Sequence, residues 1–408
     1  MASTASLDAP ARPLRRRWAI LALLFAATVL NYVDRQTLSI LASQVQRDLG
    51  ITDQGYARIV QCFLIAYTLS YVGAGWLTDR LGARVTLALM LGWWSLANMA
   101  TGLVRSAGQL GMARAALGIG APGVYTAGPK AIGVHFPAAE RGFAVGLYTA
   151  GAMIGATVAP PLIAFLALRF GWRAAFVVTG GAGLVWVVAW LAVYRNASGL
   201  ARKVERASWR EILADRSIWG LACARLIADP VWYFYLFWFP KYLTDARGLS
   251  LVSLASIAWL VYLAADVGSI GGGWFSGCLI RRGTSPVRAR LVAMTIGATL
   301  APLGMFVGLR PGLDATIALG ATVAFAHLLF QVSMGALIVD LYPGRMVATA
   351  MGLIAAGSGL GGIVSTQVVG ALVAAGSYDR VFFLMGILHP LATFVTFVSV
   401  RRRSAAAS

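Results

Sequence analysis

Long apolar runs recur from one end of the 408-residue chain to the other. Each run has about the 20 residues that a helix needs to cross a bilayer. Backbone groups in lipid must be paired within the segment, which favours helices over irregular structure. We therefore expect an all-α integral membrane protein with twelve transmembrane helices, at 18–43, 55–78, 84–104, 109–134, 142–167, 173–194, 217–241, 251–279, 288–309, 313–340, 347–373 and 378–400.

Most of the basic residues lie near the ends of these spans or in the segments between them. The formal net charge of +19 could by itself indicate nucleic-acid binding. With a cytoplasmic N-terminus, however, 21 of the 34 Lys and Arg residues lie on the cytoplasmic side, nine lie on the other side and four lie inside spans. This asymmetry is the positive-inside pattern. It predicts a multi-pass protein of the plasma membrane with both termini in the cytoplasm, and it argues against nucleic acid as a partner.

The chain contains two related halves. HFPAAERGFAVGLYTAGAMIGA (135–156) resembles LYPGRMVATAMGLIAAGSGLGG (341–362) at an offset of 206. A weaker correspondence sets GWLTDRLGAR (75–84) opposite GCLIRRG (277–283). Two parallel six-span halves place a substrate site between them near the bilayer midplane. The expected domains are a cytoplasmic tail (1–17), a six-helix bundle (18–194), a cytoplasmic linker (195–216), a second six-helix bundle (217–400) and a second cytoplasmic tail (401–408).

The segment GWLTDRLGAR joins the second and third spans. Gly82 permits a tight turn there, and Asp79 can accept bonds from a helix N-terminus or pair with an arginine. Such contacts form when this side of the protein closes and break when it opens. The segment resembles the signature loop G-x-L-x-D-R-x-G-x-R of the major facilitator superfamily, which implies a twelve-helix transporter with alternating access. The expected gating motif is Gly75, Asp79, Arg80, Gly82 and Arg84.

Four further stretches narrow the resemblance. NYVDRQTLS (31–39), HFPAAER (135–141), 229–251 and 264–283 together are similar to the anion:cation symporter family, and within it to the bacterial hexuronate and sugar-acid branch. The resemblance implies a monomer in the bacterial inner membrane that takes up an organic anion, such as a hexuronate or related sugar acid, with protons. Transport of another carboxylate (a dicarboxylate or an aromatic acid) and multidrug/proton antiport are the alternatives.

An acid and a base stand side by side in the first apolar span, as Asp34 and Arg35. An ionisable group inside a membrane segment is costly unless it is paired or faces a cavity. At about 1.5 Å per residue, Asp34 and Arg114 of the fourth span come to similar depths. An Asp held by an Arg stays ionised, and an Asp that loses its partner is protonated more easily. We predict that Asp34 and Arg114 form the proton-coupling site.

Arg35 is the expected anchor for a substrate carboxylate, because a guanidinium binds a carboxylate with two parallel hydrogen bonds. Tyr32 lies three residues earlier on a similar face of the helix. Tyr67 in the second span and Tyr233 in the seventh can supply the hydroxyl contacts that a sugar acid needs. The expected substrate-binding residues are Tyr32, Arg35, Tyr67, Lys130, Tyr233 and Gln331.

Other pairings in the second half are open at this stage. Arg225 and Asp229 are spaced to pair along one helix. Asp266 is an alternative partner of Arg225. His327, one turn before Gln331, is more typical of a hydrogen-bonded structural histidine than of a proton relay.

The stretch APGVYTAGPK (121–130) aligns with the pattern E-A-G-N-F-P-A-A-I-K of the hexuronate branch. Lys130 matches the lysine, so the resemblance implies an anion-binding role, with simple extension toward the membrane surface as the alternative. The glutamate of the pattern falls on Ala121. A carboxylate at that place shares proton coupling in the family. Its absence leaves Asp34 as the expected carrier and leaves the stoichiometry and direction of transport open.

The sequence gives no support for an enzyme. Its three histidines are scattered, and neither an HExxH nor a G-x-S-x-G pattern occurs. Its three cysteines are dispersed and have no metal-ligand spacing. We expect no cofactor and no metal. A multidrug exporter would carry G-x-x-x-G-P-x-x-G-G in its fifth span, where this chain has GAMIGATVAPPL (151–162).

Overall fold

The structure is a computed structural model that describes residues 14–195, 209–239, 242–243, 246–249, 257 and 259–407. Within these ranges the chain is helical with short turns and has no strand, which confirms the all-α class. Residues 1–13, residues 196–208 of the expected linker and the beginning of the expected span 251–279 lie outside the described residues.

The first half consists of seven helices. They are α1 (Leu14–Ile40), α2 (Ala42–Leu49), α3 (Asp53–Thr101), α4 (Ala107–Gly120), α5 (Gly123–His135), α6 (Ala138–Phe170) and α7 (Trp172–Val193). A short helix, α8 (Trp209–Ala214), precedes the second half. The second half then contains α9 (Arg216–Tyr233), η1 (Phe234–Trp238), α12 (Trp259–Arg281), α13 (Pro286–Leu300), η2 (Ala301–Leu309), α14 (Leu313–Leu341), α15 (Val347–Ala374) and α16 (Tyr378–Ala407).

These helices account for the twelve expected spans. In the described part of the chain, nine helices are long and apolar enough to cross a membrane. One of them, α3, covers two expected spans, because Gly82 with φ 81° and ψ 159° breaks it in the middle. This left-handed φ is open to glycine and strained for other residues. The two remaining expected spans are divided between shorter elements, α4 with α5 and α9 with η1.

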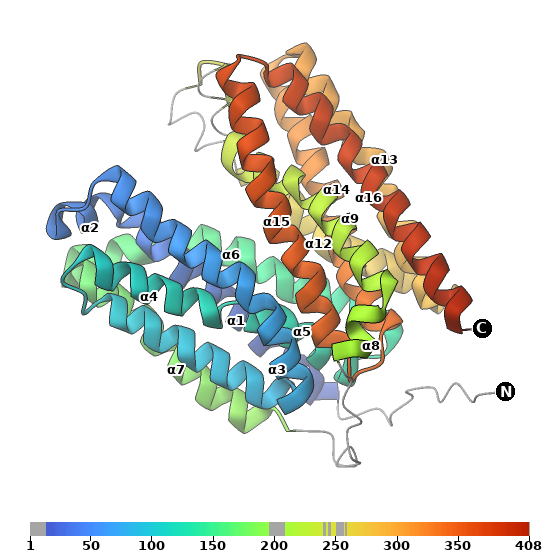
Figure 1. Cartoon of the computed structure of the whole chain (residues 1–408), viewed down its shortest axis with the longest axis horizontal. Coiled ribbons are helices and arrows are strands. Elements are labelled where there is room, and N and C mark those ends of the chain that lie inside the picture. The colour runs from blue at the N-terminus through green and yellow to red at the C-terminus, as the bar shows by residue number, and fades with distance from the viewer. Residues whose placement is uncertain are drawn as a thin grey trace.

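The two halves form separate bundles with their own cores. Two clusters of buried side chains are built from the first half, with Val332 as a single addition from α14. Two others are built from the second half alone. Figure 1 shows the bundles converging on the side where α8 and the C-terminal end of α16 lie and diverging toward α2. We call these the tail side and the far side.

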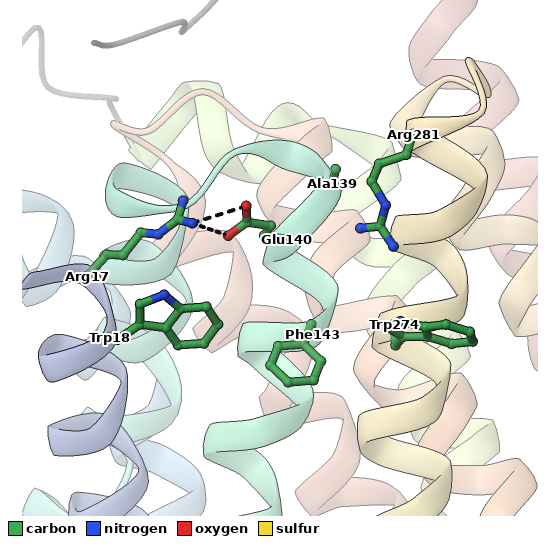
Figure 2. A pocket seen from close by; sticks show the side chains of 7 residues that line it. All are labelled: Arg17, Trp18, Ala139, Glu140, Phe143, Trp274 and Arg281. Carbon is green, nitrogen blue, oxygen red and sulfur yellow. Dashed lines mark hydrogen bonds and ion pairs between the residues drawn. The ribbon is translucent and has the colours of Figure 1, made fainter. Parts of the chain in front are cut away.

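The outer surface of the bundles is apolar. Leu168, Leu309 and Leu103 are among the large side chains that are more than 70% exposed. A surface of this kind suits a lipid solvent rather than water. Trp18 and Trp274 lie at the tail-side ends of α1 and α12 (Figure 2) and are 41% and 58% exposed, at the level where aromatic residues meet the headgroups of a bilayer.

The halves touch through glycines at two helix crossings. At the crossing of α3 and α15, a Cβ on Gly75 would lie 2.3 Å from the carbonyl oxygen of Ala348. At the crossing of α6 and α12, a Cβ on Gly146 would lie 2.4 Å from the carbonyl oxygen of Ser269. Small residues let membrane helices approach to main-chain contact. These glycines therefore position the tail-side ends of the two bundles against each other.

Candidate functional site

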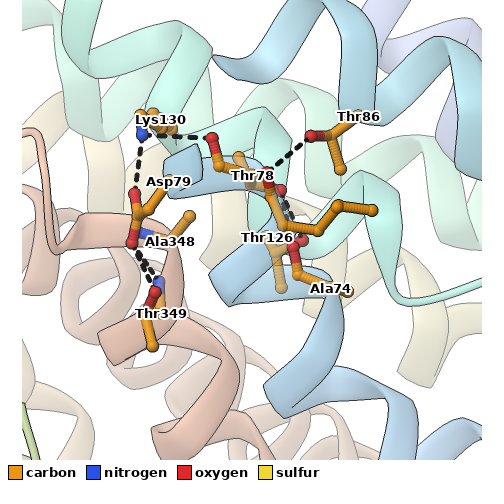
Figure 3. A network of polar contacts seen from close by, with 9 residues as sticks. Ala74, Thr78, Asp79, Thr86, Thr126, Lys130, Ala348 and Thr349 are labelled. Carbon is orange, nitrogen blue, oxygen red and sulfur yellow. Dashed lines mark hydrogen bonds and ion pairs between the residues drawn. The ribbon is translucent and has the colours of Figure 1, made fainter. Parts of the chain in front are cut away.

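A carboxylate from the first half caps a helix of the second half on the tail side (Figure 3). Asp79 accepts hydrogen bonds from the Ala348 amide at 3.2 Å, from the Thr349 amide at 2.6 Å and from the Thr349 hydroxyl at 2.6 Å. These groups belong to the first turn of α15, whose unpaired amides and dipole attract a negative charge. We call Asp79 and these three donors the latch. The expected contact between Asp79 and a helix N-terminus is present.

Lys130 also binds the Asp79 carboxylate of the latch. Its Nζ lies 2.6 Å from Asp79 Oδ1 and donates to the Thr78 carbonyl at 3.2 Å. From the sequence, a helix N-terminus or an arginine was expected as partner of Asp79, and a substrate-binding role was expected for Lys130. In the structure Lys130, which projects from α5, contacts the Asp79 carboxylate.

The other residues of the expected gating motif make contacts within the first half. Gly82 makes the turn at the break in α3. Arg84 donates to the Leu191 carbonyl at 2.7 Å and so ties the turn to the end of α7. The Arg80 guanidinium lies 5.1 Å from the centre of the Trp76 ring. Of the five motif residues, Gly75 and Asp79 are the two for which contacts with the second half are described.

A second polar cluster joins the halves on the tail side. Asp340 of α14 pairs with Arg141 of α6 at 2.8 Å and with Arg290 of α13 at 3.1 Å. Arg290 is fully buried and also donates to the Ala138 carbonyl at 2.7 Å. In the sequence, Arg141 and Arg290 stand out only as part of the positive-inside pattern, so their pairing with Asp340 was not predicted. A lone Asp near the end of an apolar span was the signal that could have found the cluster.

Asp34 is buried in the first half, where neutral groups hold its carboxylate. It is 1% exposed and accepts from Trp94 Nε1 at 3.1 Å and from Asn98 Nδ2 at 2.7 Å. Arg114 donates to the main-chain carbonyl of Asp34 at 3.4 Å and to Asn98 Oδ1 at 3.3 Å. The two expected proton-coupling residues are thus neighbours, but Asn98 bridges them, and no Asp34–Arg114 ion pair occurs among the described residues.

Arg35 points away from Asp34 into a group of aromatic rings. Its guanidinium lies 5.2 Å from the ring centres of Tyr32 and Phe63 and 4.9 Å from that of Tyr67. The Tyr67 hydroxyl is 2.7 Å from that of Tyr71. In the described part of the chain, no carboxylate lies within 4 Å of Arg35 and no hydrogen bond from its guanidinium is present. The arrangement is a cation with open donors and hydroxyl groups beside it.

One expected residue of the second half, Tyr233, lies near this group. Tyr233 lies within electrostatic range of Arg35 and Tyr67 across the interface between the halves. Gln331 is partly exposed, and its Oε1 has no hydrogen-bond partner among the described residues. Tyr32, Arg35 and Tyr67 of the first half and Tyr233 of the second half therefore lie together.

The other pairings in the second half are also settled by the geometry. Arg225 pairs with Asp229 at 2.8 Å along α9 rather than with Asp266. His327 has a partner that the sequence did not indicate, because its Nδ1 lies 3.1 Å from Nε2 of His389. Both imidazoles are buried. Since the two residues are 62 positions apart, no local pattern could have predicted this contact.

The comparisons with known proteins agree with this architecture. Residues 24–326 match the family described as the Major Facilitator Superfamily. The chain belongs to this superfamily. It is therefore a multi-pass membrane protein of a transporter family and not an enzyme, as the sequence predicted.

Relatives in the superfamily carry sugar-acid names. The chain is 31% identical over 413 residues to the hexuronate transporter of Escherichia coli (strain K12), which covers 95% of each chain. It is 33% identical over 306 residues to the galacturonate transporter of Dickeya chrysanthemi, which covers 70% of this chain and 88% of that one. Among solved structures, the proton:xylose symporter XylE bound to 6-bromo-6-deoxy-D-glucose has a similar fold, with a TM-score of 0.73 at 14% identity over 94% of this chain and 95% of that one.

Proposed function

We propose that the protein imports a sugar acid, such as a hexuronate, together with protons across the bacterial inner membrane. The tail side faces the cytoplasm, as the distribution of basic residues favours. The observation that carries the proposal is Arg35, a cation inside a membrane bundle with no carboxylate partner in the described structure. The names of the hexuronate and galacturonate transporters support the substrate class.

The substrate site lies between the halves. Arg35 receives the carboxylate, since a guanidinium offers paired donors to two oxygens. Tyr32, Tyr67 and Tyr233 contribute hydroxyl groups and ring faces to the sugar, and Gln331 adds an amide whose oxygen has no partner in the described chain. Binding residues on both bundles let the substrate draw the halves together, which is the step that alternating access requires.

The contacts between the halves on the tail side support a state that is closed on that side. The latch at Asp79 and the ion pairs of Asp340 both join the halves on the tail side. Opening toward the cytoplasm has to break both. The substrate therefore enters this conformation from the far side, where the bundles diverge.

Asp34 carries the proton. Its carboxylate is buried and held by the neutral donors of Trp94 and Asn98, so binding a proton changes the hydrogen bonds that it makes with them. Asn98 also contacts Arg114, and this shared residue passes the change to the arginine. Ala121 occupies the position at which the family resemblance implies a glutamate, and its carbonyl accepts from Asn31 at 3.3 Å. Asp34 thus acts without a second carboxylate at that place.

Counterflow in proteoliposomes tests the substrate class. Vesicles loaded with an unlabelled uronate, aldonate or dicarboxylate are given a labelled uronate, and exchange is measured without a gradient. We expect exchange with uronates in the wild type and at least about a tenfold loss in Arg35→Lys, because a lysine cannot form the paired bonds. Arg58→Lys, on the exposed far-side end of α3, is the matched control and should exchange normally. Equal exchange in Arg35→Lys and the wild type would contradict the role of Arg35.

The division of roles has its own test. Asp34→Asn removes the proton site but keeps a similar shape, so we expect counterflow to persist while accumulation driven by a proton gradient is lost. If Asp34→Asn accumulates substrate as well as the wild type does, Asp34 is not the carrier.

A further inference from the structure

The internal repeat gives the latch a counterpart in which the charge is reversed. The correspondence between GWLTDRLGAR and GCLIRRG sets Arg281 of α12 opposite Asp79 of α3. The repeat offset of 206 likewise sets the first turns of α6 opposite those of α15. At one crossing a carboxylate lies at a helix N-terminus. At the other, an arginine occupies the position of that carboxylate, so the attraction that closes the first crossing is missing.

A pocket of about 310 Å³ lies at this second crossing (Figure 2). Arg281 enters it from α12 and Glu140 from the first turn of α6. Glu140 is already neutralised, because its Oε2 lies 3.0 Å from Arg17 Nη2. In the described structure, Arg281 has no carboxylate within 4 Å, and its guanidinium donates one hydrogen bond, to Cys278 Sγ at 2.9 Å. The charged groups of the pocket therefore sum to +1, with Arg281 as the source of the excess.

The remaining walls of the pocket are mostly aromatic, and two of these rings are exposed. Trp18, Phe143 and Trp274 line it. The two tryptophans are the exposed aromatic residues at the tail-side ends of their helices. Tryptophans occur at this level because their rings pack against acyl chains while the indole N–H reaches the headgroups. A basic pocket between helices at the headgroup level has the chemistry to hold an anionic lipid headgroup.

We propose that the pocket binds the phosphate of an anionic phospholipid, with Arg281 as its charged anchor and Trp18 and Trp274 on either side of the lipid. The bound phosphate supplies the negative charge that the first crossing has in Asp79, between Arg281 and the positive N-terminal end of α6. It thereby holds α6 and α12 together and stabilises the state that is closed on the tail side. The proposal rests on the alternating-access part of the proposed function and on neither the cargo nor the proton site.

Lipid binding is tested on the full chain in nanodiscs. The protein is reconstituted in phosphatidylcholine with increasing phosphatidylglycerol, and the phosphatidylglycerol molecules that remain bound after gentle detergent extraction are counted by native mass spectrometry. We expect Arg281→Gln to lose one tightly bound phosphatidylglycerol, with affinity for that molecule reduced about tenfold or more, as for the loss of a hydrogen bond to a charged group. Arg282→Gln removes the same charge from the next residue, which does not line the pocket, and should keep that lipid.

The effect on conformation is tested by exchanging the charge. The distance between spin labels on the far side is measured with and without phosphatidylglycerol. In the wild type, the lipid should raise the fraction of protein that is closed on the tail side. Arg281→Asp supplies its own carboxylate at the N-terminal end of α6 and should be closed without phosphatidylglycerol.

Three results would overturn the proposal. Equal lipid loss in Arg281→Gln and Arg282→Gln would show a diffuse surface charge instead of a site. The same conformational shift from inorganic phosphate in pure phosphatidylcholine would assign the pocket to a free anion. Unchanged lipid retention in a folded Arg281→Gln, checked by its melting temperature, would remove the anchor. None of these readouts uses transport, so they stand apart from a failure of sugar-acid uptake.

Discussion

The latch predicts how far a single charge shifts the conformational equilibrium. In the state described, Asp79 accepts three hydrogen bonds from the first turn of α15. Hydrogen bonds to a charged group contribute about 1.5–3 kcal/mol, against about 0.5–1.5 kcal/mol for neutral ones. Asp79→Asn keeps one oxygen, loses the charge and turns an N–H toward donors. A loss of about 1 kcal/mol for each bond gives about 3 kcal/mol in total, or about 100-fold in the equilibrium between closed and open tail sides.

Distances between spin labels measure this shift. Cys62, Cys223 and Cys278 are first replaced by alanine, and labels are placed at Leu103 and Leu309. Both positions are highly exposed and lie at the far-side ends of the two halves. Because the far side closes when the tail side opens, Asp79→Asn should move the distance distribution to shorter values.

The control has the same chemistry in a different place. Asp48→Asn removes a carboxylate that accepts from Trp172 Nε1 at 2.6 Å within the first half. It should leave the distribution unchanged. If Asp79→Asn gives the wild-type distribution, or if Asp48→Asn shifts it equally, the latch does not set the equilibrium.

Two further predictions concern packing and a buried charge. Gly146→Ala should also shorten the far-side distance, because its Cβ would lie 2.4 Å from the Ser269 carbonyl oxygen. Gly181→Ala is the control and should leave this distance unchanged, because no atom lies within 4 Å of the added Cβ. Equal effects of the two variants would contradict the close approach at this crossing. Arg225→Gln should lower the melting temperature strongly, since removing one partner of a buried ion pair costs about 3–5 kcal/mol. The double variant Arg225→Gln/Asp229→Asn should recover part of the lost melting temperature, because it leaves no unpaired charge. If the double variant is as unstable as Arg225→Gln alone, an uncompensated charge is not the cause of the destabilisation.

The sequence predicts the features that depend on local patterns. Apolar runs of membrane length gave the spans, the loop motif gave the left-handed turn at Gly82, and the same motif gave Asp79 as a partner for a helix N-terminus. Each of these follows from residue type and spacing within one segment. The family resemblance added the fold and the class of relatives, which the superfamily match confirmed.

Contacts between distant helices were harder to predict. The depth of a residue in the membrane follows from its position along a helix, so Asp34 and Arg114 were expected at one level. Which groups meet there depends on how each helix is rotated about its axis, and Asn98 was therefore missed as the bridge between them. For the same reason the ion pair between Lys130 and Asp79 was not predicted.

The central claim is that a sugar acid and protons move together in the same direction. Proteoliposomes in weakly buffered medium are given a uronate, and the external pH is recorded while labelled uptake is followed. Because symport carries protons inward with the anion, the account predicts that the medium becomes more alkaline in proportion to uptake, and that Asp34→Asn abolishes this pH change. Uptake with no pH change in the wild type, or with acidification of the medium as in antiport, would contradict the account.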